Sequence, residues 1–245
     1  MVPHVEIAAE HRLHGRRVIE GRFAGQPVIL AQTGISMVNA AMTTQALIDR
    51  FAPVRIVVSG IAGGLDPACA VGEVLAPARW GQFLEVGMGR ETPAGFTLPG
   101  LPGETELPNF GMMMPRDVIV GSEAEPEVAR RWFDADPALL AVAHGLTGHP
   151  LRVGGAGLSG TAFVDNAAYR DYLHGVFGAA VLDMESAAVA QVGFANAVPF
   201  IVFRALSDLA GGEADANHLP QWIARACANV AAVTQAFVGA LAQAA

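Results

Sequence analysis

The fold class is decided by the stretch AAVLDMESAAVAQVGFANAVPFIVFRALSD, residues 179–208. It begins with a short apolar run of strand length and continues into an Ala-rich segment that is typical of a helix. The segment VPFIVFRAL that follows is almost wholly apolar, as strands buried on both faces are. A strand, a helix and a second strand in succession predict an α/β arrangement, with helices packed on a sheet.

The same alternation extends upstream towards the amino terminus. The segments RVIEGRFAG and PVILAQTG, within residues 17–34, predict two adjacent strands joined near Ala24 and Gly25. A helix capped by Ser36 or Asn39 follows, and Pro53 ends it. Its apolar residues lie roughly along one stripe, which predicts the buried face. This stripe is Val38, Met42, Leu47 and Phe51.

The remaining segments complete one domain over residues 1–245. RIVVSG predicts a buried strand at 55–60, and GEVLAPARW predicts another at 72–80. Residues 122–145 read as a helix with Ser122 as its N-cap. A Gly- and Pro-rich excursion occupies about 87–115, and a long apolar helix closes the chain. We therefore expect a single α/β domain with a central mixed sheet flanked by helices.

Composition excludes several classes of protein. The chain has 245 residues and a net charge of −8, which argues against a general nucleic-acid binder, because such a protein needs a basic face. All 15 cationic residues are Arg, which excludes Schiff-base lysine chemistry and a P-loop. The amino-terminal residues show no targeting segment, and we expect no membrane span. Two cysteines are too few for a disulfide scaffold, so we expect a cytoplasmic protein.

A glycine-rich segment, SGIAGGLDP at residues 59–67, follows the buried strand at 55–60. Ligands bind at the carboxyl ends of strands in open α/β sheets, and glycine lets backbone N–H groups approach them closely. The segment predicts a ligand-binding turn. The alternative is a tight turn that merely needs glycine.

Two carboxylates, Asp183 and Glu185, lie in the otherwise apolar segment LDMESAA at residues 182–188. Isolated carboxylates are costly to bury unless something binds them. Either acid can cap the helix that follows, and that is the structural alternative. One cap explains one acid more easily than two, so we favour a functional role for Glu185.

A third group of polar residues, Arg204, Ser207 and Asp208, ends the strand VPFIVFRAL. A carboxyl there can donate a proton if its pKa is raised. A helix N-cap or an Arg204–Asp208 ion pair would instead leave Asp208 ionised. In SGTAFVDN, Phe163 offers a flat face to an aromatic ligand, although ordinary core packing is the commoner role of such a residue. The histidines show no metal-ligand spacing, so no metal is expected.

The order and separation of these motifs resemble the nucleoside phosphorylase family. The motifs are SGIAGGLDP, GEVLAPARW, SGTAFV, LDMESAAVA and VPFIVFRALSD. Within the family the chain looks most like the 5′-methylthioadenosine/S-adenosylhomocysteine nucleosidases. TGISMVNAAMTTQ and the Trp that closes APARW also resemble a plant-type branch that includes storage proteins. The resemblance implies cleavage of the N-glycosidic bond of a purine nucleoside, with release of adenine and no organic cofactor.

The resemblance also implies a role for each matching residue. Asp208 would be the general acid that protonates the leaving purine, Ser207 would place its carboxyl, and Arg204 would lie near the attacking water or anion. The substrate-binding residues would surround the nucleoside. They are Glu185 and the Met184 backbone at the ribose hydroxyls, Phe163 and the Val164 backbone at the base, and Ala62 and Gly63 at the ribosyl side.

The sequence departs from the family pattern in three places. The family opens with a strand and a Glu-rich turn that activates the attacking water, and MVPHVEIAAE does not match them. Either the chain begins downstream of that first βα unit, or the protein lacks it. Ile61 stands where a hydroxyl residue is common, and Asp183 stands where the family has Glu.

Two other functions remain open at this stage. Phosphorolysis needs a cationic cradle, and Arg204 is the single Arg in the matched pocket motifs, so water is favoured as the acceptor over phosphate. A catalytically weak storage or binding protein on the same fold is the second alternative. The resemblance further implies a homodimer in which residues 95–115 close the neighbour's site, unless they form a lid over their own subunit.

Overall fold

The computed structural model describes residues 4–211 and 219–242. Its centre is an eight-stranded sheet in the order β13-β6-β15-β16-β4-β17-β5-β14. Strand β4 runs parallel to β17 and antiparallel to β16, so the sheet is mixed, as predicted. The strand bounds are β13 Trp132–Asp134, β6 Arg79–Gln82, β15 Ala156–Ser159, β16 Ala179–Asp183, β4 Ile56–Gly64, β17 Phe200–Leu209, β5 Val74–Ala76 and β14 Leu151–Val153.

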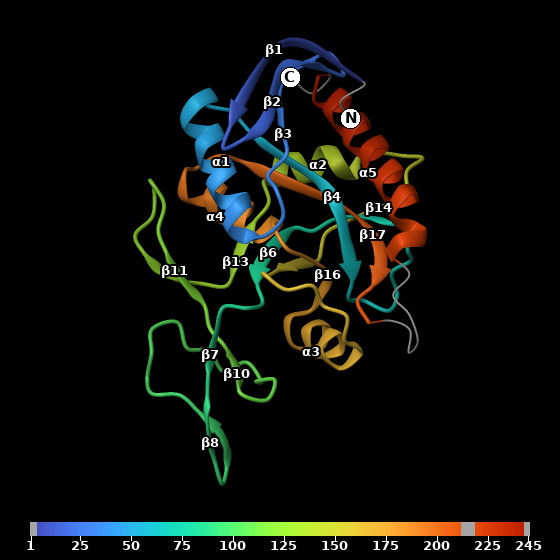
Figure 1. Cartoon of the computed structure of the whole chain (residues 1–245). Helices are drawn as coiled ribbons and strands as arrows, with labels where there is room; N and C mark the ends of the chain where they lie inside the picture. The colour runs from blue at the N-terminus through green and yellow to red at the C-terminus, as the bar shows by residue number, and fades with distance from the viewer. Residues whose placement is uncertain (1–3, 212–218, 243–245) are drawn as a thin grey trace.

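Helices cover both faces of this sheet (Figure 1). Successive side chains of a strand point to opposite faces. Along β17, Ile201 and Phe203 pack in the cluster that includes α5, whereas Val202 and Leu206 pack in the cluster that includes α4. The helix bounds are α1 Met37–Phe51, α2 Pro137–His144, α3 Ala167–Phe177, α4 Ser186–Ala195 and α5 Leu219–Leu241. By the same alternation, Arg204 belongs to the α4 face.

The carboxy-terminal helix α5 is a core helix of this fold. By length and composition alone, Trp222–Leu241 could cross a membrane, with a mean hydropathy of 1.2. Val233 and Phe237 of this stretch are fully buried, and Phe237 lies 4.9 Å from the ring of Phe203 on β17. Packing on the sheet therefore accounts for the buried apolar residues of this helix.

A separate three-stranded antiparallel sheet precedes α1. It contains β1 Val5–Leu13, β2 Arg16–Phe23 and β3 Gln26–Ala31. Strands β2 and β3 are joined at Ala24 and Gly25, as predicted, and both residues have positive φ values of 48° and 80°. Two such residues favour the tight turn of a two-residue hairpin. Phe23 is buried in the cluster that contains the residues of α5.

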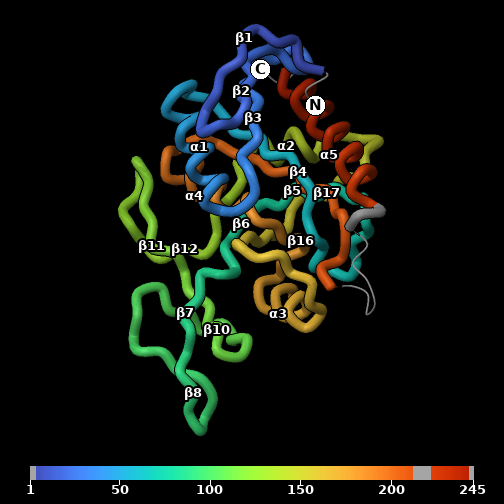
Figure 2. Tube along the Cα trace, in the orientation of Figure 1, coloured from blue at the N-terminus to red at the C-terminus, as the bar shows by residue number. Residues whose placement is uncertain are grey.

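The Gly- and Pro-rich excursion extends from the body of the domain (Figure 2). It folds as two short ribbons that contain β7 Val86–Met88 with β10 Met113–Pro115, and β8 Arg90–Thr92 with β9 Gly95–Thr97. Phe110 packs on the rings of Tyr169 and Tyr172 of α3, at 4.9 and 5.2 Å between centroids. Tyr172 also donates a hydrogen bond to the carbonyl of Pro108 at 2.8 Å. The base of the excursion is therefore anchored on its own chain.

The predicted helix over residues 122–145 is wrong in its first half. Strands β11 Val118–Val120 and β12 Val128–Arg130 form a hairpin there, and β13 follows. The Ser122 hydroxyl accepts hydrogen bonds from the amides of Ala124 and Glu125, which makes a turn and no helix cap. Asp136 is the true cap, accepting from the amide of Leu139 at 2.9 Å, with Pro at the first helical position.

Two further local predictions are wrong. The strand expected at 72–80 is divided into β5 and β6, because Pro77 has no N–H to continue the ladder. The apolar stripe of α1 faces outward at its start, with Val38 74% exposed and Met42 41% exposed. The buried residues of α1 are instead Ala40, Thr43 and Thr44. Small side chains let α1 lie close to α4.

Candidate active site

The glycine-rich segment 59–67 does not form the predicted turn at its start. Strand β4 continues through it to Gly64, paired in parallel with β17. A Cβ on Gly60 would lie 1.9 Å from Nη1 of Arg204, so the guanidinium occupies the space that a side chain would need. Glycine is therefore required here by the close approach of Arg204 to the backbone of β4.

A β-bulge at Ser207 interrupts the pairing of β17 with β4. Leu206 pairs with Ala62 and Asp208 pairs with Gly63, so Ser207 is the extra residue. Bulges turn a strand's side chains away from strict alternation and are common beside active sites. This bulge places Ser207 and Asp208 at the carboxyl end of β17, both buried, next to Gly63 of β4.

Asp183 accepts hydrogen bonds from three elements. Its Oδ1 accepts from the Ser159 hydroxyl of β15 and from the amides of Glu185 and Ser186, both at 3.0 Å. Its Oδ2 accepts from the Ser186 hydroxyl and lies 2.7 Å from Nε of Arg204. Asp183 is therefore the acid that caps α4, as the structural alternative allowed.

Glu185 makes no side-chain cap for α4, although it occupies the N-cap position. Its carboxylate accepts a hydrogen bond from the Ser36 amide at 2.9 Å and lies 3.3 Å from Nη2 of Arg204. Burial raises its pKa above the ordinary value, while Arg204 and the Ser36 amide act in the opposite direction. Sequence reasoning assigned Ser36 to helix capping and missed this contact.

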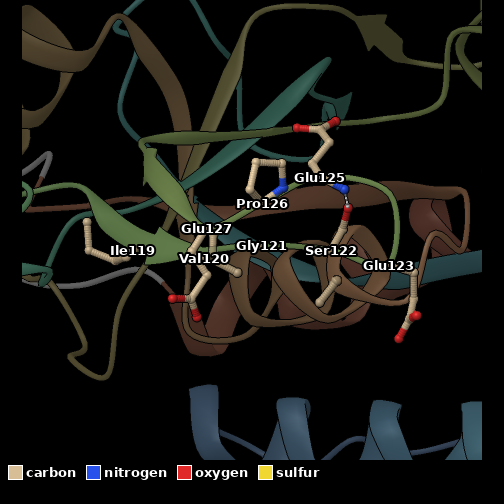
Figure 3. A pocket seen from close by; sticks show the side chains of 9 residues that line it. Ile119, Val120, Gly121, Ser122, Glu123, Glu125, Pro126 and Glu127 are labelled. Carbon is tan, nitrogen blue, oxygen red and sulfur yellow. Dashed lines mark hydrogen bonds between the residues drawn. The ribbon is translucent and has the colours of Figure 1, made fainter.

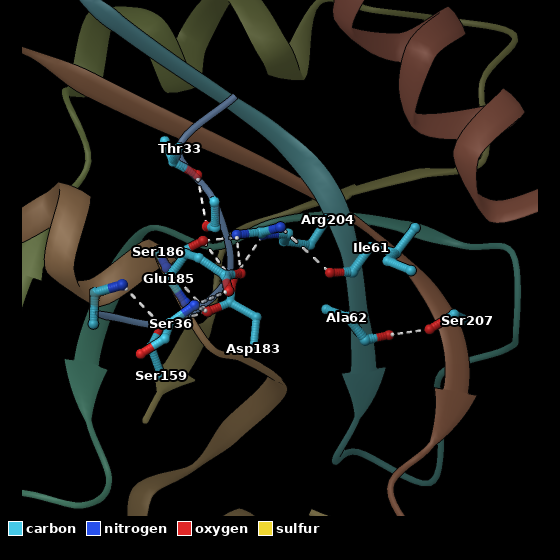
Figure 4. A network of polar contacts seen from close by, with 12 residues as sticks. Thr33, Ser36, Ile61, Ala62, Ser159, Asp183, Glu185, Ser186, Arg204 and Ser207 are labelled. Carbon is cyan, nitrogen blue, oxygen red and sulfur yellow. Dashed lines mark hydrogen bonds and ion pairs between the residues drawn. The ribbon is translucent and has the colours of Figure 1, made fainter. Parts of the chain in front are cut away.

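Arg204 links the acids to the glycine-rich strand (Figure 4). Besides its two carboxylate partners, it donates to the Ser186 hydroxyl at 3.0 Å and to the Ile61 carbonyl at 3.4 Å. The next residue of β4, Ala62, has its carbonyl 3.2 Å from the Ser207 hydroxyl, which lies 2.9 Å from Oδ1 of Asp208. The two groups of polar residues therefore contact the backbone carbonyls of two adjacent residues of β4, Ile61 and Ala62.

The segment that carries Phe163 and Val164 lies beside the end of β17. A Cβ on Gly211, just after β17, would lie 2.5 Å from the amide of Ala167 at the start of α3. Val164 is buried, but Phe163 is 59% exposed, which excludes the core packing that was its alternative role. An exposed ring on this segment is free to contact a ligand.

Two cavities of the molecule lie away from these residues. One, of about 500 Å³, is a shallow, open hollow lined by the β11–β12 hairpin and Ala195 (Figure 3). The other, of about 300 Å³, is a groove between α1 and α4. Neither is lined by Glu185 or Asp208. Within residues 4–211 and 219–242, no group of three or more His, Cys, Asp and Glu side chains could hold a metal ion.

Comparison with known proteins places the chain in a family. Residues 3–239 match the model of the phosphorylase superfamily. A 5′-methylthioadenosine/S-adenosylhomocysteine nucleosidase of Listeria welshimeri is 31% identical over 214 residues, which are 87% of this chain and 81% of the relative. The corresponding protein of Bacillus thuringiensis is 29% identical over 213 residues, with the same coverage of 87% and 81%.

Solved structures agree with this assignment. An S-adenosylhomocysteine nucleosidase of Streptococcus pyogenes, in complex with 5-methylthiotubericidin, has a TM-score of 0.74 and 25% identity, and the match covers 98% of this chain and 90% of that one. A futalosine hydrolase of Helicobacter pylori shares the fold, with a TM-score of 0.69 and 22% identity over 96% of this chain and 88% of that one. The family, the mixed α/β fold and the expectation of an enzyme are thus confirmed. The chain belongs to the phosphorylase superfamily.

Proposed function

We propose that the protein hydrolyses the N-glycosidic bond of a purine nucleoside of the 5′-methylthioadenosine/S-adenosylhomocysteine type and releases adenine. The observation that carries this proposal is that two acid-bearing groups contact the carbonyls of adjacent residues of β4. One contains Glu185 with Arg204, and the other contains Asp208 with Ser207. The substrate class is supported by relatives that match most of this chain and are named 5′-methylthioadenosine/S-adenosylhomocysteine nucleosidases.

Asp208 is the general acid of the proposed reaction. A purine anion is a poor leaving group, and protonation by a positioned acid accelerates its departure by about 10²–10⁴-fold. The Ser207 hydroxyl lies within hydrogen-bond distance of Oδ1 of Asp208, at 2.9 Å, and of the Ala62 carbonyl, at 3.2 Å. When the hydroxyl donates to Oδ1, the proton of the neutral Asp208 carboxyl is carried by Oδ2, the oxygen beside Gly63. Ser207 thus orients the acid before the proton moves to the purine ring nitrogen.

Glu185 binds the ribose hydroxyls, together with the backbone of Met184, and must be ionised. The ribosyl carbon becomes cation-like as the bond breaks, and a carboxylate beside it stabilises that charge. Burial disfavours the ionised form, but Arg204 and the Ser36 amide favour it. Holding one carboxyl group protonated and a second one ionised in the same site is a recognised route to acid catalysis near neutral pH.

The base and sugar would be enclosed by the remaining residues of the site. Phe163 stacks on the purine, with an exposed ring that supports this role, and the Val164 backbone bonds the purine edge. Ala62 and Gly63 line the ribosyl side. The absence of a Cβ on Gly63 favours close approach, since that atom would lie 3.7 Å from Oδ2 of Asp208.

Water is the proposed nucleophile because Arg204 already pairs with two carboxylates. Its guanidinium lies 2.7 Å from the Asp183 carboxylate and 3.3 Å from that of Glu185. One cation between two ionised carboxylates leaves a local negative charge, which opposes a phosphate anion. Arg204 can still orient a neutral water molecule. This arrangement disfavours phosphorolysis.

We further propose a cytoplasmic homodimer. The first turn of α1 exposes Val38, and Ile35 just before it is 73% exposed. These side chains adjoin the groove between α1 and α4, which is lined by Met37 and Val192 among others. A second copy would cover this apolar surface. Both cysteines, Cys69 and Cys227, are free thiols, which suits a reducing compartment.

The test is base release from a panel of nucleosides, with and without phosphate. The panel contains 5′-methylthioadenosine, S-adenosylhomocysteine, adenosine, inosine and futalosine. We expect adenine release from the first two in phosphate-free buffer, unchanged when phosphate is added. The Asp208→Asn variant, purified identically, controls for nucleosidases of the expression host. Strict dependence on phosphate would overturn the hydrolysis, and a thermal shift without any product would instead indicate a binding protein.

A further inference from the structure

The carboxylate of Asp183 divides its partners between its two oxygens. Oδ1 accepts the amides of Glu185 and Ser186 and the hydroxyl of Ser159. Oδ2 accepts the Ser186 hydroxyl and the Nε of Arg204. One oxygen therefore fixes the start of α4, and the other holds the guanidinium that contacts Glu185.

A helix cap alone does not need the second oxygen. The amide hydrogen bonds to Oδ1 are sufficient to cap α4, and an uncharged Asn caps a helix as well as Asp does. The contact with Arg204 is the shorter of the two that this guanidinium makes with carboxylates, at 2.7 Å against 3.3 Å to Glu185. The side chain of Asp183 is only 2% exposed, so this ion pair is shielded from solvent.

We propose that Asp183 is a positioning residue for the nucleosidase reaction, which holds Arg204 and the backbone of Glu185 so that the Glu185 carboxylate meets the ribose. The inference rests on the proposed function of the same site. Asp183 does not touch the substrate in this account. It acts through Arg204 from one oxygen and through the first turn of α4 from the other.

The charge of Asp183 gives this role a signature that a cap would lack. The charged groups that act on Glu185 are Arg204 of β17 and Asp183 of β16, together with the backbone N–H groups of Ser36 and Met184. Arg204 lowers the pKa of Glu185, and the negative charge of Asp183 raises it. The effect of Arg204 is the larger of the two, so a variant that releases Arg204 from Glu185 raises the pKa of Glu185.

The decisive variant is Asp183→Asn, which can keep the cap and loses the charge. We expect kcat to fall on the order of 10²-fold, the size of effect that a misplaced reacting group produces. KM should change less, because the ribose-binding carboxylate is still present. The acid limb of the kcat/KM profile should move to higher pH, since Glu185 ionises less readily once Arg204 is released. Wild-type kcat with an unmoved acid limb would overturn the proposal.

Two matched variants separate positioning from capping and from folding. Asp183→Glu keeps the charge, and we expect it to retain most of the turnover and the wild-type acid limb. Asp136→Ala removes the cap of α2, far from the site, and should lower stability without moving the pH profile. If Asp183→Asn does not fold, the turnover of Asp183→Glu tests the proposal instead. A Glu variant that folds but loses turnover on the order of 10²-fold contradicts positioning by charge.

A titration that needs no catalysis distinguishes this proposal from the proposed function. The ¹³C-carboxyl resonance of Glu185, assigned with Glu185→Gln, reports its ionisation directly. We expect its midpoint to rise in Asp183→Asn and to stay in Asp183→Glu. If the wild-type protein releases no base from any nucleoside but the midpoint shifts as expected, the proposed function fails and the coupling stands. An unshifted midpoint overturns the coupling whatever the activity.

Discussion

Burial of the ionised Glu185 carboxylate decreases the free energy of unfolding. Its side chain is 15% exposed and accepts from one amide and one guanidinium, yet burial still raises its pKa. A carboxyl that is more readily protonated in the folded protein than in the unfolded chain opposes stability when it is ionised at neutral pH. In the proposed reaction, the same burial strengthens its effect on a positive ribosyl centre.

We predict that Glu185→Gln increases stability, and increasingly so as the pH rises. In the unfolded chain the carboxyl has its ordinary pKa, and in the folded protein the pKa is raised. The protonated Glu185 carboxyl therefore contributes stability that is fully present below the pKa of the unfolded chain. This stability is lost as the pH rises through the pKa of the folded protein. Thermal denaturation between about pH 4 and pH 8 measures this. A difference in Tm that shrinks with rising pH would contradict it.

At the scale of single elements, β4 departs most clearly from what its sequence predicts. SGIAGG reads as a turn because its glycines are typical of turns. The structure keeps it as a strand, since a Cβ at Gly60 would collide with Arg204 of the neighbouring strand. The requirement for glycine is visible in the sequence, but its cause is a side chain 144 residues away that only the fold brings close.

We predict that Gly60→Ala displaces Arg204 and abolishes most activity while the fold is retained. The new Cβ would lie 1.9 Å from Nη1 and 3.0 Å from Cζ of Arg204. Gly175→Ala is the matched control, because no atom lies within 4 Å of a Cβ there and the residue is in α3. The control should keep full activity and gain about 0.5–1 kcal/mol of stability. Equal activity in the two variants would count against the placement of Arg204.

Other elements show where sequence patterns suffice. The strand at Ala179–Asp183, helix α4 and strand β17 follow their predictions, because apolar runs of strand length and an Ala-rich segment leave few alternatives. The bulge at Ser207 and the contact of Ser36 with Glu185 do not appear in any local pattern. Both depend on pairing between segments far apart in the chain. The sequence thus indicates both acids and favours a functional role for Glu185, which stays a prediction, whereas the hydrogen bonds that distinguish Asp183 from Glu185 come from residues of other segments.

At the scale of the whole molecule, helix α1 shows the limit of periodicity arguments. The stripe containing Val38 and Met42 predicted the buried face, but those residues are exposed in the single chain. An amphipathic pattern predicts which face of a helix is buried, but it does not predict whether the same chain or a second copy buries that face. A second copy on this surface would reconcile the pattern with the structure.

We predict that the protein is a dimer and that Val38→Asp dissociates it. Val38 lies in the first turn of α1, where an acidic residue suits the helix dipole, so the monomer should remain folded. Val54→Asp is the matched control, since Val54 is 77% exposed beyond the other end of the helix. Sedimentation velocity measures both. A monomeric wild-type protein, or a dimeric Val38→Asp variant, would contradict the assignment.

The central claim is that Asp208 gives its proton to the departing purine while Glu185 stays ionised beneath the sugar. Its most direct test is turnover and analogue binding by Asp208→Asn, measured together on the same preparation. Asn keeps the shape of the side chain and cannot supply the proton. We predict a loss of kcat of about 10²–10⁴-fold with binding of a substrate analogue retained. Turnover at the wild-type rate by Asp208→Asn would contradict the account.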